Sequence, residues 1–306
     1  MAYPWVSNIF SQKAATSTVS AYEEAVEDAG DQEIAEALAA AEEYNLTVQR
    51  SQIQLTDPFD PALADAMEAE TDAEYSSLLN LSRDGVMCYV DIPAISVYLP
   101  VFHGTSDNVL SAGAGHLEGS SLPVGGESTH AVITGHTGLT SAKMFTDLTE
   151  LEEGDLFYIH VLGKVLAYEV SEIQVVLPEN TTPLLVREGE DLVTLVTCTP
   201  YGVNTYRLLV TGTRTEYSAE AYEDASSDAA GNAVNSLWMR SYRNAVMAGL
   251  AIIAGVRIAI GVILKIWKKK KKQAEDAAGA GQDPAGEGRK GTGSGKERKG
   301  KKERKP

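Results

Sequence analysis

The sequence predicts a mainly β protein that carries helices before its strands and a membrane-spanning helix after them. From residue 86 onward, runs rich in valine, leucine, isoleucine and threonine alternate with glycine-rich turns, as strands and their connections do. Earlier in the chain apolar residues recur at helical spacing, and near the C-terminus lies one long apolar run. A hydrophobic content of 43% in 306 residues is ample for a packed core.

The first 84 residues are predicted to be a helical region. Residues 19–48 follow a helical pattern that Gly30 breaks or bends, and residues 72–81 are predicted to form a short helix. Between them, residues 55–61 (LTDPFDP) favour a turn, because Asp-Pro is a good turn starter, and they carry an aromatic residue, Phe59, that is expected to be exposed. The apolar residues on the two helical faces are Val19, Tyr22 and Val26, then Ile34, Leu38 and Ala41.

Residues 85–216 are predicted to form the β domain. Seven or eight strands within about 130 residues favour a closed barrel or a sandwich. No internal repeat accompanies them, so a repeat architecture is not expected. The predicted strands are residues 86–92, 96–101, 131–134, 156–161, 165–176, 192–198 and 206–213.

The apolar run Ala245–Trp267 is predicted to cross a lipid bilayer. As a helix, its 23 residues would span about 35 Å, enough for the hydrocarbon core. Lys268–Lys272 follow at once and mark the cytoplasmic side, so the residues before the run are expected to be extracellular. The alternative is a buried core helix. Arg257 is the main objection to a membrane helix, at a cost of roughly 2.5–3.5 kcal/mol that the apolar neighbours offset.

Charge is unevenly distributed along the chain. The net charge of −17 argues against nucleic acid as the main partner. Residues 268–306 carry a net +8 and are predicted to be a disordered cytoplasmic tail, while the acidic residues 217–244 are predicted to be a linker. The first ten residues have neither a basic start nor a long apolar core, so we expect the natural chain to begin upstream with a hydrophobic segment.

A thiol and a guanidinium are predicted to share one hairpin. Residues 192–198 and 205–213 have strand composition, and Pro200, Gly202 and Asn204 favour a loop between them. With a loop of residues 199–204, Cys198 faces Thr205, and Arg207 is its diagonal neighbour on the same face, roughly 7–8 Å away. That distance suits two groups that hold opposite ends of one carbonyl.

A cysteine needs a cation or a general base nearby to act as a nucleophile. The second cysteine, Cys88, is predicted to be a buried strand residue, although one disulfide between the two remains an alternative. Among the five histidines, His136 stands between two glycines after an apolar strand, a place that exposes a side chain. The other candidates are His103 and His116, each beside a glycine, and His130 and His160, which are predicted strand residues.

These motifs together resemble the sortase family. Thr194-Leu-Val-Thr-Cys198 resembles the TLxTC signature of that family, and Thr-Gly-His136 resembles its catalytic histidine motif. Arg207, nine residues after the cysteine, matches the catalytic arginine. The resemblance extends over about residues 4–214 and includes Gly115–Pro123 and Lys143-Met-Phe145.

Two further features resemble class C, the pilus-assembling sortases. Asp57-Pro58-Phe59 is similar to their lid, in which an aspartate and an aromatic residue fold over the active site, and the C-terminal membrane helix is also typical. Tyr206 departs from the histidine that many class C enzymes have before the arginine. We expect little effect, because neighbouring side chains of a strand point to opposite faces.

The resemblance implies a closed eight-stranded barrel and an acyl-transfer mechanism. Cys198 would attack an LPxTG-like sorting signal on a pilin or surface protein to give a thioester. Arg207 would stabilise the oxyanion. His136 would protonate the leaving amine and then deprotonate the entering one. Thr197 and Thr194 are weaker candidates for positioning the substrate or the arginine. No sequence pattern indicates a metal or a cofactor.

Three alternatives to a pilus-assembling enzyme remain open. A housekeeping sortase would anchor surface proteins to a peptidoglycan amine, and a cysteine peptidase would use water as the acceptor. A membrane-tethered adhesin or structural β protein would carry Cys198 only as a small apolar residue of the core, which is a common role of buried cysteines. The lid motif and the C-terminal anchor favour pilus assembly among these.

Overall fold

The computed structural model describes residues 3–51, 55–60, 73–139, 141–226 and 237–279. Two compact units divide the chain, residues 1–246 and residues 247–306. The first unit contains all the strands and is described here first, because it carries the candidate site.

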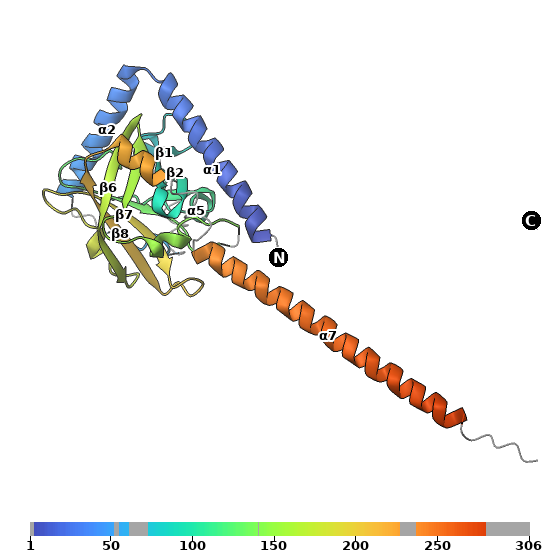
Figure 1. Ribbon diagram of the computed structural model, residues 1–306. Coiled ribbons are helices and arrows are strands. Elements are labelled where there is room, and N and C mark those ends of the chain that lie inside the picture. Colours follow the sequence, from blue (N-terminus) through green and yellow to red (C-terminus); the bar gives the residue numbers. More distant parts are fainter. Residues whose placement is uncertain (1–2, 52–54, 61–72, 140, 227–236, 280–306) are drawn as a thin grey trace, which may run out of the picture. The chain divides into compact units, whose positions relative to one another are not determined.

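Eight strands close into one barrel in the order β1-β2-β3-β4-β7-β8-β6-β5, which confirms the predicted fold class (Figure 1). Buried side chains such as Val90, Ile133, Phe157, Leu195 and Val210 fill its interior. The strands are β1 Val86–Ile92, β2 Val97–His103, β3 Ala114–His116, β4 Thr129–Thr134, β5 Leu156–Val161, β6 Lys164–Val176, β7 Asp191–Thr199 and β8 Tyr206–Thr215.

One strand, β3, has no counterpart among the predicted strands. It has three residues and contains Gly115, whose added Cβ would lie 2.2 Å from the Gly104 carbonyl oxygen. It pairs in parallel with β2 and antiparallel with β4. So short a strand is defined by its partners and not by a pattern of its own, which is why composition does not reveal it.

Two long helices, α1 Tyr3–Asp28 and α2 Asp31–Arg50, meet at Gly30 and lie against the barrel (Figure 1). The predicted break at Gly30 is present, but α1 begins at Tyr3 and not near Val19. Pro4 is tolerated there because the first helical turn does not need its N–H. The predicted apolar face of α1 is buried, with Val19 at 0% and Tyr22 at 2% exposure.

Polar anchors fix both helices to the barrel. The Tyr22 hydroxyl donates to the Met87 carbonyl oxygen, 3.1 Å, and accepts from the Leu162 N–H, 3.0 Å. Asn45 of α2 pairs with both the N–H and the C=O of Leu122, at 2.6 and 3.1 Å. The shorter helices are α4 Ala73–Ser77, α5 Asp107–Ala112, and the 3₁₀ turns η1 Pro93–Ile95, η2 Thr146–Glu150 and η3 Thr182–Leu184.

The acidic segment after β8 is partly helical. Residues 219–226 form a helix in which Tyr222 donates to the Asp91 carboxylate, 2.7 Å, and packs edge-on against Tyr158 with ring centroids 4.8 Å apart. The predicted linker 217–244 therefore begins with an ordered contact to β1 and β5. Residues 227–236 of it lie outside the described residues.

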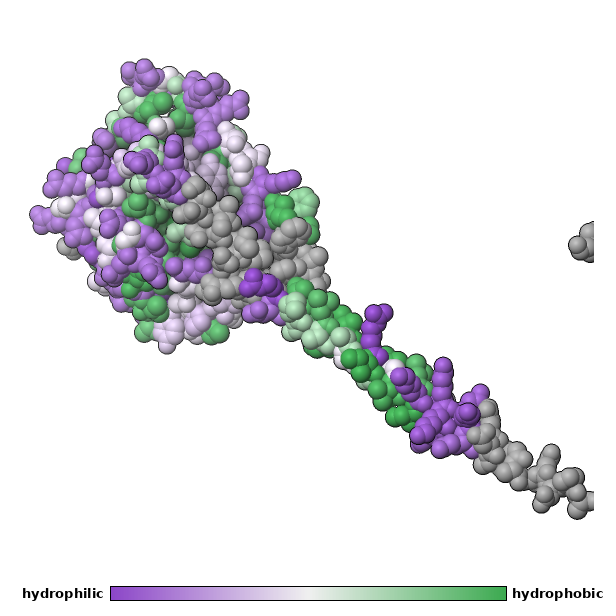
Figure 2. Space-filling model, in the orientation of Figure 1, coloured by the Kyte–Doolittle hydropathy of each residue, from purple (hydrophilic) through white to green (hydrophobic). Residues whose placement is uncertain are grey.

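The second unit contains most of α7, Leu237–Gly279. Within the described part of the chain, α7 contains the one segment whose length and composition would let it cross a membrane, Arg243–Ala274. Figure 2 shows its apolar surface ending at a group of hydrophilic residues, where Lys268–Lys272 lie. The helix continues through residues 268–279, which were predicted to be disordered. The rest of the predicted tail, residues 280–306, lies outside the described residues.

Candidate active site

The thiol and the guanidinium lie directly opposite each other on β7 and β8. The register pairs Cys198 with Arg207 and Thr199 with Tyr206. The predicted register, with Cys198 opposite Thr205, is therefore wrong by two residues. The connecting loop is residues 200–205, because β7 extends to Thr199 and β8 begins only at Tyr206. The correction brings the two groups closer, since directly opposed Cβ atoms are about 4.5–5.5 Å apart.

The sheet topology brings His136 to the same end of the barrel. Strands β4 and β7 are parallel, with Thr134 opposite Val196, and the Gly135 N–H donates to the Val196 carbonyl oxygen, 3.0 Å. Continuing this register by two residues sets His136 beside Cys198. Parallel pairing thus converts two motifs that are 62 residues apart in the sequence into neighbours.

Glycine and phenylalanine hold the histidine segment in place. A Cβ at Gly135 would lie 2.6 Å from the ring of Phe145, so only glycine fits between that ring and β4. The Phe145 N–H donates to the His136 carbonyl oxygen, 3.0 Å. The Lys143-Met-Phe145 motif is therefore structural support for the histidine. Nearby, buried Lys143 forms an ion pair with Asp147, 2.9 Å.

Cys198, His136 and Arg207 line one cavity of about 240 Å³. Both Cys198 and Arg207 are only 8% exposed. The remaining lining residues come from the lid motif, from the start of α5 and the residues before it, and from the β7–β8 loop: Pro58, Phe59, Thr105, Asp107, Leu110 and Asn204.

Asp57 forms an ion pair with Arg207 across the mouth of the site. The Arg207 Nε and Nη2 atoms donate to the two Asp57 carboxylate oxygens, at 2.7 and 2.6 Å. The Phe59 ring lies 5.2 Å from the guanidinium carbon and 5.7 Å from the His136 ring, centroid to centroid. The residues that resemble a lid therefore contact the guanidinium and the imidazole, and they line the same cavity as the thiol.

Burial keeps the thiol and the imidazole uncharged in this arrangement. It raises the pKa of Cys198 to about 11; Arg207 lowers that pKa and Asp57 raises it. Burial also lowers the pKa of His136, while Asp107 acts in the opposite direction. At neutral pH the site therefore holds a thiol beside a neutral ring, with its one cation neutralised by Asp57.

The two threonines of the cysteine motif have different surroundings. The Thr197 hydroxyl donates to the Gly135 carbonyl oxygen, 2.7 Å, so it holds the residue before His136. Thr194 is fully buried, and its hydroxyl lies 2.6 Å from His130 Nε2 and 2.7 Å from the Thr211 hydroxyl. It does not line the cavity, so its contacts are those of a core residue.

The remaining histidines lie outside the cavity that holds Cys198. His103 and His116 contact Tyr75, and His130 contacts Thr194. His160 stacks on Tyr89 with ring centroids 4.3 Å apart. Both cysteines are free, and Cys88 is fully buried, so the alternative of a disulfide is wrong.

Sequence reasoning missed the contribution of α5. Asp107 lines the cavity and acts to raise the pKa of His136. Thr105 and Leu110 line the same side of the cavity. The available signal was Ser106-Asp107, a helix N-cap followed by an acidic residue, which predicts the start of a helix. The Ser106 side chain does accept from the Val109 N–H, 3.4 Å. Nothing in that signal places the helix beside His136.

Comparison with known proteins identifies the family. A family model described as the sortase domain matches residues 90–215, which include His136, Cys198 and Arg207. The crystal structure of sortase C-1 from Actinomyces oris is 47% identical, with a TM-score of 0.53, and the match covers 60% of this chain and 98% of that chain. The chain belongs to the sortase family.

Other sortases are similar over different lengths. The type III crystal structure of Streptococcus agalactiae sortase C1 is 40% identical, with a TM-score of 0.61, over 68% of this chain and all of that one. Sortase A of Streptococcus agalactiae serotype III is 30% identical over 147 residues, 43% of this chain and 59% of that protein. This sortase thus spans about three fifths of that relative's length but nearly all of the class C structures.

Proposed function

We propose that this sortase is a cysteine transpeptidase that joins pilin subunits. It cleaves an LPxTG-like sorting signal through a thioester on Cys198 and transfers the acyl group to a lysine amine of the next pilin. The observation that carries the enzymatic part is the meeting of a thiol, an imidazole and a guanidinium in one cavity. The pilin part is supported by the likeness to sortase C structures, among them that of Streptococcus pneumoniae sortase C, which bears on pilin substrate specificity.

In the first step His136 takes the proton of the Cys198 thiol, and the sulfur forms a bond to the scissile carbonyl carbon. Negative charge then develops on the carbonyl oxygen, and the guanidinium opposite the cysteine donates hydrogen bonds to it. Collapse of this intermediate breaks the C–N bond. His136 gives a proton to the leaving amine, and the acyl group remains on sulfur as a thioester.

In the second step a lysine amine attacks the thioester. His136 removes a proton from the attacking nitrogen, the C–S bond breaks, and the product is an isopeptide bond with a free thiol. Water in place of the amine would make the enzyme a hydrolase, and a peptidoglycan amine would make it a cell-wall anchoring enzyme. The acceptor therefore distinguishes pilus assembly from these two alternatives.

The lid residues regulate access in this proposal. Asp57 occupies the same guanidinium that must bind the oxyanion, and Phe59 lies over the imidazole. The closed arrangement is consequently inactive, and a sorting signal must displace the segment to bind. An equilibrium with a gap of a few kcal/mol keeps the open form available.

The membrane segment anchors the enzyme in this proposal. With Lys268–Lys272 on the cytoplasmic side, α7 anchors the barrel at the outer surface of the membrane, where surface proteins with sorting signals emerge. The length and composition of Arg243–Ala274 support a single membrane-spanning helix there.

Mass spectrometry tests the chemistry directly. Incubation with an LPxTG peptide is expected to leave a thioester adduct on the peptide that contains Cys198, and Cys198→Ala is expected to abolish it. Cys88→Ala is the matched control and keeps the adduct, because that thiol is buried in the barrel. Polymer formation by Cys198→Ala would refute the mechanism.

The acceptor is tested in a second reaction. Adding a pilin domain to the acyl-enzyme is expected to yield a lysine-linked conjugate faster than free acid. Release of acid alone would favour the peptidase alternative, and transfer only to a peptidoglycan peptide would favour the anchoring enzyme. Absence of any adduct would favour a non-catalytic structural protein.

A further inference from the structure

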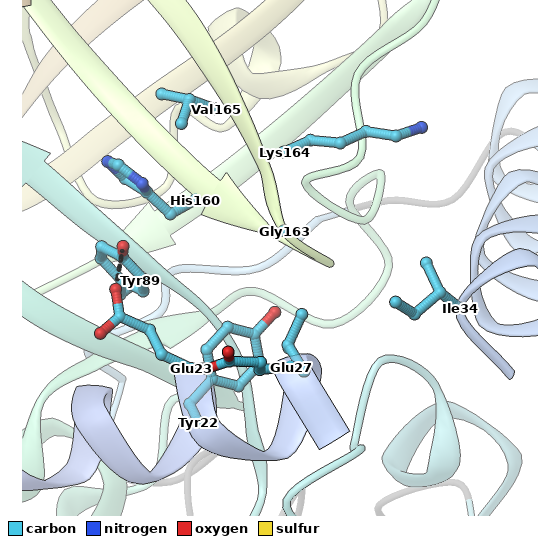
Figure 3. A pocket seen from close by; sticks show the side chains of 10 residues that line it. Tyr22, Glu23, Glu27, Ile34, Tyr89, His160, Gly163, Lys164 and Val165 are labelled. Atoms are coloured by element: carbon cyan, nitrogen blue, oxygen red, sulfur yellow. Dashed lines mark hydrogen bonds between the residues drawn. The ribbon is translucent and has the colours of Figure 1, made fainter. Parts of the chain in front are cut away.

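A second cavity lies between the N-terminal helices and the barrel, and the proposed mechanism does not use it. Its volume is about 530 Å³, within the range of ligand-binding clefts. Tyr22 and Val26 of α1 and Ile34 of α2 provide an apolar floor and wall, and Gly163 in the β5–β6 turn lies opposite (Figure 3). This cavity is called the helix cleft below.

The helix cleft is acidic along one edge. Glu23 and Glu27 are one turn apart on α1, and both line it. Glu23 accepts a hydrogen bond from the Tyr89 hydroxyl, 2.6 Å. Neither carboxylate forms an ion pair within the described residues. The one basic lining residue, Lys164, extends away from the two carboxylates (Figure 3).

An aromatic pair borders the same edge. Tyr89 and His160 stack with ring centroids 4.3 Å apart and planes 10° from parallel. Burial lowers the pKa of His160 to about 4, so this ring carries no charge at neutral pH that would repel a cation. Aromatic rings beside carboxylates form a surface that attracts an organic cation, through the ring quadrupole and through charge.

The helix cleft is remote from the thiol. Lys164 begins β6, and Val176 at the other end of that strand pairs with Arg207. The 13 residues of β6 correspond to about 40 Å of extended strand. A ligand held at Lys164 therefore does not reach Cys198, and it would act as a docking contact.

We propose that the helix cleft binds a lysine side chain of a protein partner. The aliphatic stem lies on Tyr22, Val26 and Ile34, and the ammonium reaches the carboxylates of Glu23 and Glu27. A long basic side chain has this division into an apolar stem and a charged end. Both carboxylates are solvent-exposed, so their ion pair with an isolated amine would be weak. A lysine side chain on a protein binds more tightly, because neighbouring residues of that protein add further contacts to this one. We therefore take the partner to be a protein.

The test uses the full chain in nonionic detergent at low salt and ligand-observed NMR. The probe is Nα-acetyl-lysine N-methylamide, for which we expect a Kd on the order of 1 mM. The norleucine analogue has the same stem without the ammonium, and we expect it to bind at least about fivefold more weakly. The Glu23→Gln/Glu27→Gln variant is expected to lose about the same factor, whereas Lys164→Gln is expected to bind more tightly.

Controls separate this site from the active site. Glu24→Gln removes an equal charge from the same helix but does not line the cleft, so it is expected to leave the Kd within twofold. Glu23→Gln keeps an oxygen that accepts from Tyr89, and thiol alkylation of the double variant should match that of the unchanged protein. Alkylating Cys198 beforehand should also leave lysine binding unchanged.

Three outcomes would overturn the proposal. One is equal binding of the lysine and norleucine probes. Another is a double variant that binds lysine as tightly as the unchanged protein. The third is loss of lysine binding when Cys198 is alkylated, because the probe would then occupy the active site. None of these bears on thioester formation, so the proposed enzymatic function is tested separately.

Discussion

Removing the lid residues should make the buried thiol reactive. The change is Asp57→Ala combined with Phe59→Ala, which takes away the carboxylate on Arg207 and the ring beside His136. Burial raises the pKa of Cys198 to about 11 from an ordinary value of 9.0, and Asp57 contributes a smaller part of that rise. Both effects weaken when the segment is gone, while Arg207 still lowers the pKa.

The size of the effect follows from the thiolate fraction. At pH 7.5, a return of the pKa from about 11 to about 9 increases the thiolate about 100-fold, from roughly 1 in 3,000 to 1 in 30. A thiolate of lower pKa is less nucleophilic, with a Brønsted slope of about 0.4–0.5, which removes about tenfold. The net expectation is an alkylation rate about tenfold faster, before any gain in access.

The assay is alkylation by iodoacetamide, with peptide mapping of both cysteines. Cys88 has no exposed surface and provides the internal control, because it reacts only when the barrel unfolds. Labelling is expected to be faster at Cys198 alone, with the pH–rate curve of the double variant displaced to lower pH. An unchanged rate at Cys198 would show that the segment is an ordinary loop, and labelling of Cys88 would show unfolding.

Three further substitutions test the contact that holds the segment before His136 and two contacts that stabilise the barrel and α2. Thr197→Val removes the hydrogen bond to Gly135, so kcat/KM for peptide cleavage should fall about tenfold, and Thr197→Ser should restore it. Gly212→Ala puts a Cβ 2.4 Å from the Phe157 ring and should lower the free energy of unfolding by about 1–3 kcal/mol in urea denaturation. Asn45→Ala removes both anchors of α2 on the barrel, and the same measurement should show a loss of about 2 kcal/mol.

Much of the fold was predictable because the barrel strands have a composition that differs from that of the turns between them. The bounds predicted for β1 and β5 agree with the structure, and those of β2, β4, β6, β7 and β8 differ by one or two residues at their ends. The N-terminal helix was predicted too short, because its buried face continues toward the N-terminus as Ala15 and Asn8, a small and a polar residue that form no apolar pattern. Its start is set by what it packs on, which sequence periodicity does not encode.

The site was predictable as a set of residues but not as a geometry. The motifs name Cys198, His136 and Arg207, but local sequence does not fix the register of β7 and β8. Six loop residues, with Asn204 in the left-handed region at φ 60°, close the hairpin one residue later than turn composition implied, which moves the partner of Cys198 by two residues. The pairing of Asp57 with Arg207 joins segments 150 residues apart, and only the family resemblance pointed to it.

In the proposed mechanism the guanidinium of Arg207 makes closure and catalysis mutually exclusive. Arg207 Nη1 is already engaged, since it donates to the carbonyl oxygens of Asn204 and Tyr206, both at 3.1 Å. This leaves the edge formed by Nε and Nη2, which Asp57 occupies with both carboxylate oxygens. In the proposed mechanism the oxyanion above Cys198 needs the same edge, so its single oxygen must take the place of the two Asp57 oxygens. By this mechanism a sorting signal that binds productively has to displace Asp57, and an empty site stays closed.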